Sequence, residues 1–310
     1  MPSSSKPPLP LYLTGPTGSG KSAVALLLAA ATGGEIIGAD AYQIYQKIPI
    51  LTAQPTAAEL ARVPHHLYGT VPLGEDMDAG RFERMALAAI AGVQSRGRLP
   101  IVCGGSGLYI KTLTHGLSPL PPGDPGLRRE LEPLSPEELA DRLMQLDPGS
   151  AEQLNLQNPR HVTRALEICL LTGQPASALK QSWAMPRSGV RGVFLDLPRA
   201  ELYDRINART HAMVAAGVVA EVAALAEDEL SSTSAKAIGL WEFRAVAEEA
   251  TSLQEAIASV QQTTRHYAKR QAAWFKREEA FVRIPVAPPD SALETACRIA
   301  RIFGFPEPRG

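Results

Sequence analysis

The stretch that decides the fold is Gly15-Pro16-Thr17-Gly18-Ser19-Gly20-Lys21-Ser22, which matches the pattern G-x-x-x-x-G-K-[ST] at every fixed position. An apolar run typical of a strand, Leu9–Leu13, precedes it, and an Ala- and Leu-rich helix is predicted over Ser22–Thr32. In this context the loop N–H groups surround a phosphate, Lys21 supplies a charge and the Ser22 hydroxyl ligates Mg²⁺. We therefore predict a diphosphate site at residues 15–22, with Mg²⁺ as cofactor and Ser22 as its ligand.

The alternation of strand and helix continues beyond this loop. Apolar strands are predicted at 35–39 and 99–103, with a helix at 81–96 between them, and later strands at 191–197 and 281–284. Alternating elements of this kind indicate a parallel sheet covered by helices on both faces. The predicted fold class is α/β, a P-loop NTPase-like parallel sheet flanked by helices, with an all-helical insertion domain.

The insertion is predicted where the sequence becomes helical without any clear strand. Helices are expected at 136–146 and 159–171, between the breaker-rich stretches Leu117–Gly123 and Trp183–Pro186. We predict a helical insertion domain over 118–187. The catalytic core then comprises 1–117 and 188–310, and ends in helices predicted at 198–227, 236–249 and 253–276.

Composition excludes several classes of protein. The 310 residues include 31 Lys+Arg and 32 Asp+Glu, a net charge of −1 that argues against a basic coat over the whole surface. The longest apolar stretch, Ala23–Ala31, is far shorter than the ~20 residues that cross a bilayer. Residues 1–10 are rich in Ser and Pro and lack the apolar centre of a signal peptide. We expect a cytoplasmic enzyme, monomeric and without a membrane partner.

Cysteine and histidine usage predicts structural roles. Cys103, Cys169 and Cys297 are far apart and have apolar neighbours, so we interpret all three as core residues rather than as disulfides or zinc ligands. His65 and His66 are adjacent, and adjacent side chains seldom converge on one metal ion. A structural role is predicted for both histidines.

Asp40 is the first candidate for chemistry, because it ends the strand predicted after the loop helix. Reacting groups in open α/β sheets gather at the carboxyl ends of strands. Beside Lys21 and a metal, an ionised Asp40 carboxylate accepts a proton or helps to hold the metal. The alternative is an Asp that caps the helix that follows. Ser106, after the next strand, reaches the same pocket or serves only as a helix N-cap.

Arg209 is the second candidate. It lies on the same stripe as Leu202, Ile206 and Met213 in the helix predicted from residue 198. Charged side chains are rarely buried unpaired, so Arg209 should meet an anion. We favour the phosphates over a carboxylate.

The ligand of the loop stays open at this point. The strand at 99–103 ends in Gly104-Gly105-Ser106-Gly107, without the Asp that would provide the second metal anchor of an NTP hydrolase. Two classes remain: small-molecule kinases, and enzymes for which pyrophosphate is the leaving group. A third reading is an NTP-dependent switch that binds RNA without changing it.

A basic segment near the end of the chain predicts a nucleic-acid surface. Between residues 264 and 277 there is no acid, and the basic residues are interleaved with Tyr267, Trp274 and Phe275. A solvated basic face over an aromatic core is the alternative. The basic residues are Arg265, Lys269, Arg270, Lys276 and Arg277.

These residues together resemble one family, the bacterial tRNA dimethylallyltransferases, over nearly the whole chain from residue 11 to 276. No segment beyond the phosphate loop is decisive alone, but their order and spacing are highly specific. The segments are GPTGSGKS (15–22), IIGADAYQIY (36–45), HHLYG (65–69), PIVCGGSGLY (100–109), GLSPLP (116–121), RALE (164–167), LYDRI–R–M (202–213), AIG (237–239) and YAKRQAAWFK (267–276).

The resemblance implies transfer of the dimethylallyl group of dimethylallyl diphosphate to the N6 amine of adenosine 37, in the anticodon loop of tRNA. By matching position, Asp40 resembles the general base and Arg209 the arginine that steadies the diphosphate, while Ser106 stands where the family usually has Thr. We take these three as catalytic, and the resemblance implies that the helical insertion domain over 118–187 contacts the tRNA. Counting the basic face, the tRNA-binding residues are predicted to be Asp40, Ala41, Tyr42, Gln43, Ser106, Arg160, His161, Arg164, Lys236, Arg265, Lys269 and Arg270.

The sequence departs from the family pattern at three places. The usual G-T-A-K-P reads Leu51–Pro55 (LTAQP), the usual Gln-Arg before RALE appears as Arg160-His161, and an Arg near AIG is represented at best by Lys236. These changes concern tRNA contacts more than chemistry. Arg164 has its own alternative, a pair with Glu167 one turn later. A kinase and a prenyltransferase that uses free AMP or ADP remain the rival enzymes.

Overall fold

The computed structural model describes residues 7–117, 120–180, 186–286 and 290–309. The chain forms two compact units, residues 1–114 with 188–310, and residues 115–187. Of the boundary stretches singled out in the sequence, residues 118–119 and 183–185 lie outside the described residues, as do residues 1–6 of the N-terminal stretch.

The first unit contains a six-stranded sheet in the order β3-β2-β4-β1-β5-β6. Every pairing between these strands is parallel, so the predicted sheet is confirmed. The strands are β1 (Leu11–Thr14), β2 (Glu35–Gly38), β3 (His65–His66), β4 (Pro100–Gly104), β5 (Arg191–Asp196) and β6 (Phe281–Pro285).

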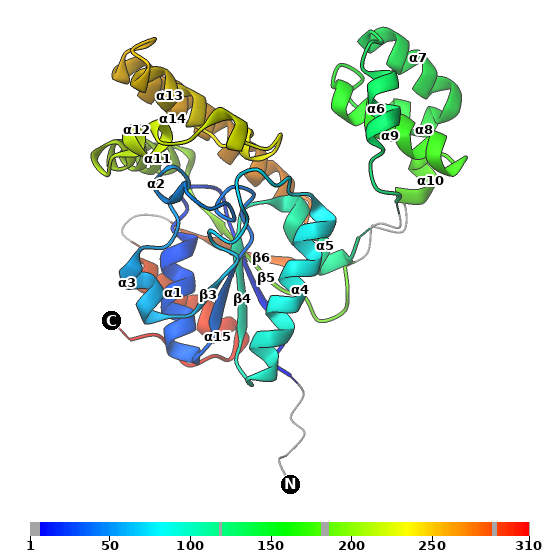
Figure 1. Ribbon diagram of the computed structural model, residues 1–310. Coiled ribbons are helices and arrows are strands. Elements are labelled where there is room, and N and C mark those ends of the chain that lie inside the picture. The colour runs from blue at the N-terminus through cyan, green and yellow to red at the C-terminus, as the bar shows by residue number, and fades with distance from the viewer. Residues whose placement is uncertain (1–6, 118–119, 181–185, 287–289, 310) are drawn as a thin grey trace. The chain divides into compact units, whose positions relative to one another are not determined.

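Side chains alternate between the two faces of the sheet, and each face is covered by helices (Figure 1). Leu11 and Leu13 pack into the cluster that includes Ala296 of α15, whereas Tyr12 packs into the cluster that includes Phe82 of α4. Both faces are buried, which is why the strands read as continuous apolar runs. The helices of these layers are α1 (Lys21–Thr32), α3 (Ala57–Arg62), α4 (Ala79–Ser95), α5 (Gly107–His115) and α15 (Ala292–Phe303).

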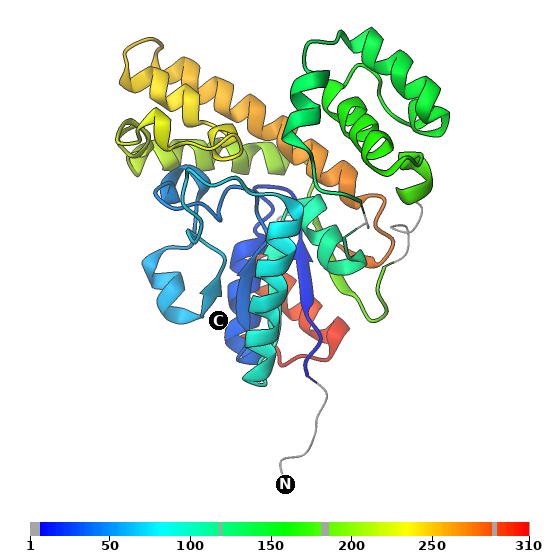
Figure 2. The ribbon, with the colours of Figure 1, turned by 45° about the vertical axis from the view of Figure 1, so that its right-hand side comes forward.

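The last third of this unit departs from the predicted helices. The helix expected at 198–227 breaks at Gly217, whose φ of 93° belongs to the left-handed region, and Gly239 likewise delays the helix expected from residue 236. The helix α15 was missed. Figure 2 shows α11 to α14 gathered side by side. The elements of this part are α11 (Arg199–Ala215), α12 (Val218–Ala223), two 3₁₀ turns (Glu227–Glu229 and Ser234–Lys236), α13 (Leu240–Ala247) and α14 (Leu253–Phe275). The short helix α2 (Pro49–Thr52), from earlier in the chain, contacts α12.

Within its described residues, the second unit contains helices joined by loops and no strand. Its core contains Leu143, Val162 and Leu166, each fully buried. The Glu167 carboxylate, also fully buried, accepts hydrogen bonds from Arg128 and Arg164. The helices are α6 (Pro125–Leu131), α7 (Pro136–Leu146), α8 (Pro148–Gln153), α9 (Pro159–Thr172) and α10 (Ala176–Lys180).

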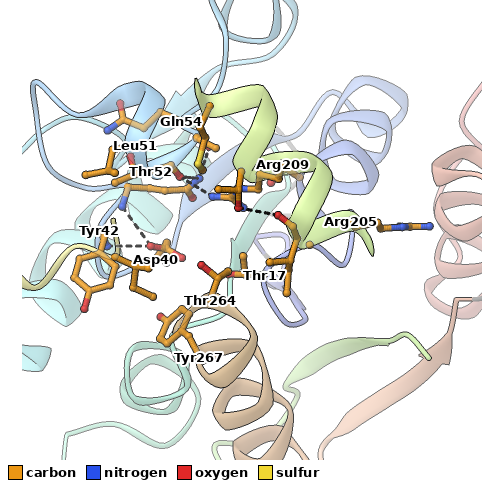
Figure 3. Close-up of a pocket in the computed structure, with 18 of the residues that line it drawn as sticks. Thr17, Asp40, Tyr42, Leu51, Thr52, Gln54, Arg205, Arg209, Thr264 and Tyr267 are labelled. Atoms are coloured by element: carbon orange, nitrogen blue, oxygen red, sulfur yellow. Dashed lines mark hydrogen bonds between the residues drawn. The ribbon is translucent and has the colours of Figure 1, made fainter. Parts of the chain in front are cut away.

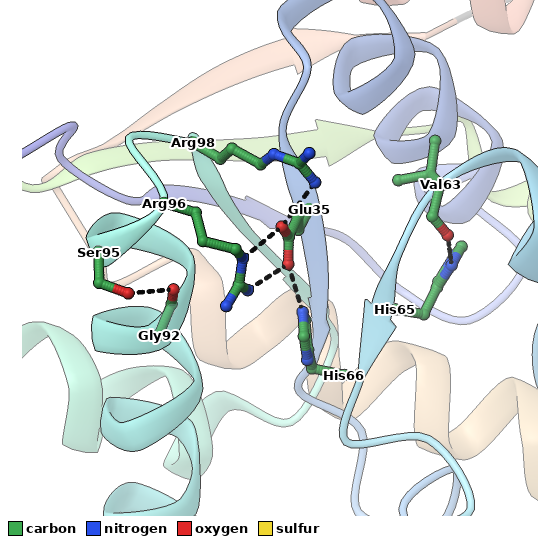
Figure 4. Close-up of polar contacts among 8 residues, drawn as sticks. All are labelled: Glu35, Val63, His65, His66, Gly92, Ser95, Arg96 and Arg98. Carbon is green, nitrogen blue, oxygen red and sulfur yellow. Dashed lines mark hydrogen bonds and ion pairs between the residues drawn. The ribbon is translucent and has the colours of Figure 1, made fainter.

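A second buried carboxylate lies at the start of β2 (Figure 4). Glu35 is 2% exposed and accepts hydrogen bonds from Arg96, Arg98 and His66 at 2.6–3.0 Å. The Arg96 hydrogen bond is the largest cause that lowers the pKa of Glu35, from 4.5 to about 2. His65 bonds instead to the carbonyl of Val63. The structural role predicted for the two histidines is confirmed.

The cysteines follow the prediction in part. Cys103 and Cys169 are buried, whereas Cys297 is partly exposed and its Sγ lies 3.7 Å from the carbonyl oxygen of Pro308. It lies in the middle of α15 on the side that meets Pro308, so it is not a core residue. None of the helices in the described residues has the length and apolar character needed to cross a membrane.

Candidate active site

A cavity of about 480 Å³ in the first unit brings most of the predicted catalytic residues together. Its walls come from the phosphate loop, the turn after β2, α2, α11 and α14 (Figure 3). These segments are far apart in the sequence. The carboxyl ends of β1 and β2 lead into two of them, as expected for an open parallel sheet.

The phosphate loop has the backbone geometry that its glycines predict. Gly20 caps α1 with a φ of 83° and no side-chain cap, so the first N–H groups of the helix are open to an anion. Gly18 has a φ of 88°, and a Cβ there would lie 3.3 Å from Leu202 and Ile206. Behind the loop, Ser19 N–H donates to the Pro16 carbonyl at 3.0 Å. The loop residues that line the cavity are Thr17, Gly18, Gly20, Lys21 and Ser22.

Lys21 places a buried cation in this cavity. Its side chain is 9% exposed, and its Nζ lies 3.5 Å from the carbonyl oxygen of Pro16. Burial lowers the pKa of Lys21, and the nearby Asp40 carboxylate opposes that change. Among the described residues, the carbonyl of Pro16 is the only hydrogen-bond partner of this buried ammonium, which is therefore suited to receive an anion.

Asp40 lines the same cavity and is held in place through one of its two oxygens. Oδ1 accepts from the N–H groups of Tyr42 at 2.9 Å and Gln43 at 3.3 Å, which belong to a turn and not to a helix. The alternative that Asp40 caps a following helix is therefore wrong. Within the described part of the chain, Oδ2 makes no hydrogen bond and stays available to a ligand.

Arg209 reaches the cavity from α11. Its Nη2 donates to the carbonyl oxygen of Thr52 at 3.2 Å, and burial lowers the pKa of its guanidinium, with Asp40 opposing. Among the described residues it forms no ion pair with a carboxylate within 4 Å. The cavity thus holds two partly desolvated cations, Lys21 and Arg209, near the Asp40 carboxylate. Arg205 and Glu59 also line it.

Residues 51–54 of the segment that departs from the family pattern, Leu51–Pro55, form another part of the cavity wall. The Glu221 carboxylate accepts from the N–H groups of Ile50 and Leu51, both at 2.8 Å, and Gln43 donates to the carbonyls of Thr52 and Ala53. The short α2 is therefore held from two sides. The apolar side chains that line the cavity are Leu51, Ile206, Met213, Ile238 and Val260.

Ser106 lies beside the turn after β2. Its Oγ accepts from the N–H of Ala41 at 2.9 Å, and its side chain lies close enough to the phenol of Tyr267 to oppose the rise in that group's pKa. Its carbonyl accepts from Ile110, so its backbone starts α5 while its side chain points to the turn. Ser106 does not itself appear in the cavity wall, in contrast to Asp40 and Arg209.

Tyr267 lines the cavity. The sequence predicts it only as one of the aromatic residues interleaved with the basic residues of 264–277. Burial raises the pKa of its phenol, and Figure 3 shows its ring beside the cavity with Thr264. Val260, Thr264, Tyr267 and the buried Gln271 recur at intervals of four, three and four residues. That helical period was the signal in the sequence that indicates one inward-facing stripe.

The residues present fit a magnesium ion together with a diphosphate. The hydroxyl of Ser22 and the carboxylate of Asp40 both line the cavity. No cluster of three or more His, Cys, Asp or Glu occurs among the described residues, so they contain no all-protein cage. Mg²⁺ commonly keeps waters and binds through one or two protein oxygens plus phosphate, which suits this sparse set.

Among the predicted tRNA-binding residues of the first unit, Lys236, Lys269 and Arg270 are exposed. Arg270 lies over the Tyr267 ring at 5.6 Å. Arg265 instead faces α11, where it donates to Asn207 Oδ1 at 2.6 Å and lies over a tyrosine ring. The basic residues of α14 thus do not form one uniform face.

In the second unit, Arg160 and His161 are exposed at the start of α9. Arg164 is partly buried, pairs with Glu167 at 3.1 Å and donates to the carbonyl of Pro121. The alternative pairing predicted for Arg164 is present.

The parallel sheet flanked by helices and the glycine loop at the start of α1 define an α/β protein with a P-loop NTPase-like fold. The family model of IPP transferase matches residues 43–278, most of the chain. The chain belongs to the IPP transferase family.

Individual relatives agree with this assignment. The chain is 41% identical over 295 residues to the tRNA dimethylallyltransferase of Akkermansia muciniphila, covering 95% of this chain and 99% of that one. It is 42% identical over 274 residues to tRNA dimethylallyltransferase 1 of Citrifermentans bemidjiense, covering 86% and 89%. The crystal structure of the tRNA isopentenylpyrophosphate transferase of Bacillus halodurans matches with a TM-score of 0.69 and 31% identity, covering 95% of each chain.

Proposed function

We propose that this chain transfers the dimethylallyl group of dimethylallyl diphosphate to the N6 amine of adenosine 37 in the anticodon loop of tRNA. Family membership and the names of its relatives support this activity. The observation that carries the chemistry is one cavity that holds the phosphate loop, Lys21, Arg209 and the free oxygen of Asp40.

The diphosphate is proposed to bind at residues 15–22. The N–H groups at the start of α1, the Lys21 ammonium and the Arg209 guanidinium surround the place where a leaving group would develop charge. Such preorganised donors stabilise a departing anion by roughly 3–4 kcal/mol each. Mg²⁺, held through Ser22, would add its charge to the same oxygens when bound.

Asp40 is proposed as the general base. As N6 attacks C1 of the allylic chain, the C1–O bond breaks and its electron pair leaves with the diphosphate. The N6 proton passes to Oδ2 of Asp40, the oxygen that no backbone amide occupies. A positioned base of this kind contributes ~10²–10⁴-fold.

The tRNA is proposed to approach over α14. Adenosine 37 can enter a cavity of this size only when it is splayed out of its stack, as loop nucleotides allow. The exposed Lys269 and Arg270 are the strongest candidates for phosphate contacts, whereas Arg265 is engaged by α11. In the helical unit, Arg160 and His161 are the corresponding exposed candidates.

The test is to incubate the protein with unmodified tRNA, dimethylallyl diphosphate and Mg²⁺ and to weigh the nucleosides after digestion. We expect an adenosine enlarged by a five-carbon group only when all three are present. Release of ADP from ATP would favour the kinase, prenylation of free AMP would favour the adenylate prenyltransferase, and tRNA binding without a change of mass would favour the switch.

A salt series on tRNA binding tests the RNA surface. Affinity should fall steeply with salt, and less steeply for Lys269→Ala, because each lost phosphate contact reduces the slope by about one. The exposed acid Glu248 provides a matched control, Glu248→Ala, that should leave the slope unchanged. If the salt dependence of tRNA affinity is the same for the wild type and Lys269→Ala, Lys269 makes no phosphate contact.

A further inference from the structure

Gln271 joins α14 to the phosphate loop. It is 4% exposed, and its side-chain Oε1 accepts a hydrogen bond from the backbone N–H of Thr17 at 2.8 Å. The two residues are 254 positions apart in the chain. Because a backbone N–H can only donate, this contact also determines which end of the amide faces the loop.

The other end of the amide is packed against the loop after β4. A Cβ at Gly105 would lie 2.2 Å from Gln271 Nε2 and 3.0 Å from the carbonyl oxygen of Gly15. No side chain can occupy that position unless the amide moves. The absence of a side chain at Gly105 is therefore what allows Gln271 to reach Thr17.

The bond satisfies a donor that the loop cannot satisfy for itself. Thr17 lines the cavity and is 8% exposed, and Pro16 before it has no N–H. A buried N–H without an acceptor destabilises the conformation that contains it. Gln271 thus favours the loop conformation in which Thr17 faces the cavity.

We propose that Gln271 is a positioning residue for diphosphate binding: it holds the phosphate loop through Thr17 and is itself outside the cavity wall. The same helix, α14, presents Thr264 and Tyr267 to the cavity. The hydrogen bond between Gln271 and Thr17 therefore fixes the position of the phosphate loop relative to this wall of the cavity. This inference rests on the proposed function.

The experiment compares Gln271→Met, which keeps the length of the side chain without an acceptor, with Gln262→Met at an exposed position of the same helix. Steady-state kinetics with dimethylallyl diphosphate and tRNA are combined with calorimetric titration of inorganic pyrophosphate in the presence of Mg²⁺. For Gln271→Met, the KM for dimethylallyl diphosphate and the Kd for pyrophosphate should rise about tenfold, the size expected for a lost acceptor. The KM for tRNA should change less than about twofold, because Gln271 acts on the phosphate loop and distant sites without shared partners are usually independent.

A role in folding alone would lower the amount of active protein and leave both constants unchanged, which would overturn the proposal. Equal increases in the KM of both substrates, or the same increase in Gln262→Met, would also overturn it. If the wild type binds pyrophosphate but transfers no dimethylallyl group, the proposed function fails while the effect of Gln271 on pyrophosphate binding can still be read.

A second route does not depend on Gln271→Met being folded. Gly105→Ala adds the methyl group that displaces the amide, so it should raise the Kd for pyrophosphate about tenfold in the wild type. In a Gln271→Ala background, Gly105→Ala should raise the Kd for pyrophosphate by no more than about threefold, because the amide that the new methyl group would displace is absent. Additive effects in the two backgrounds would contradict the inference.

Discussion

The two ends of β2 carry carboxylates with opposite surroundings. Glu35, the first residue of the strand, is buried and accepts hydrogen bonds from two arginines and a histidine. Asp40, just past the other end, uses one oxygen for the turn and leaves the other facing a cavity. A carboxylate whose oxygens are all satisfied serves stability, whereas one with a free oxygen can do chemistry. The substitutions below test this contrast.

The largest effect is expected for Asp40→Asn. Asparagine keeps an oxygen for the N–H groups of Tyr42 and Gln43, so the turn is preserved, but it cannot take a proton. Turnover in the tRNA assay should fall by ~10²–10⁴-fold. Pyrophosphate binding and the free energy of unfolding, the latter within about 0.5 kcal/mol, should match the wild type. Near-normal turnover would remove Asp40 from the role of base.

Glu35→Gln should show the reverse pattern. The lowered pKa of Glu35, about 2 against 4.5, corresponds to roughly 3 kcal/mol of stability at neutral pH. Urea unfolding should detect most of that loss, while kcat per folded molecule stays unchanged because the cluster is remote from the cavity residues. An unchanged unfolding midpoint would contradict the stabilising role of the cluster.

The pH dependence of unfolding sharpens the contrast. Because the folded-state pKa of Glu35 is below its unfolded value, its contribution is complete above pH 4.5 and is lost as the pH falls toward about 2. The difference in unfolding free energy between the wild type and Glu35→Gln should therefore shrink progressively below pH 4.5. A difference that stays constant down to pH 3 would assign the effect of the substitution to packing.

The smallest effect is expected where a carboxylate is paired but not buried. Glu229 and Lys47 form an ion pair at 2.8 Å, with side chains 44% and 58% exposed. Glu229→Gln should cost ~0–1 kcal/mol, since water solvates both charges and salt screens them. The same urea titration measures it. A loss of unfolding free energy as large as that of Glu35→Gln would show that ion pairing alone stabilises the protein. Burial would then not be what makes the Glu35 cluster stabilising.

Local sequence predicted the parts of the protein that depend on neighbouring residues. The glycine loop at 15–22, the strands around it and the position of Asp40 at a strand end follow from backbone preferences over a few residues. The break at Gly217 and the helix α15 were missed. An isolated glycine is often tolerated inside a helix. Only the observed φ of 93° at Gly217 shows that the helix ends there instead of continuing through it.

The helical stripe and the family resemblance both placed Arg209 near the phosphates, but neither predicted its contact with Thr52. Tyr267 belonged by sequence to a basic face, and the structure turns it into the cavity wall. Arg265 moved in the opposite direction, from a predicted RNA contact to a partner of Asn207 on α11. Helical periodicity identifies which residues share a stripe, but the packing of α14 against α11 decides which stripe faces inward.

The sequence by itself predicted a phosphate site at the end of a strand in a parallel sheet, because that loop is specified by glycine conformation and local order. Only the tertiary structure decided that Gln271 supports Thr17 and that Glu35 meets Arg96, Arg98 and His66. Such contacts join segments that no short-range pattern connects. They exist because folding the sheet leaves buried polar groups that must find partners wherever the chain returns.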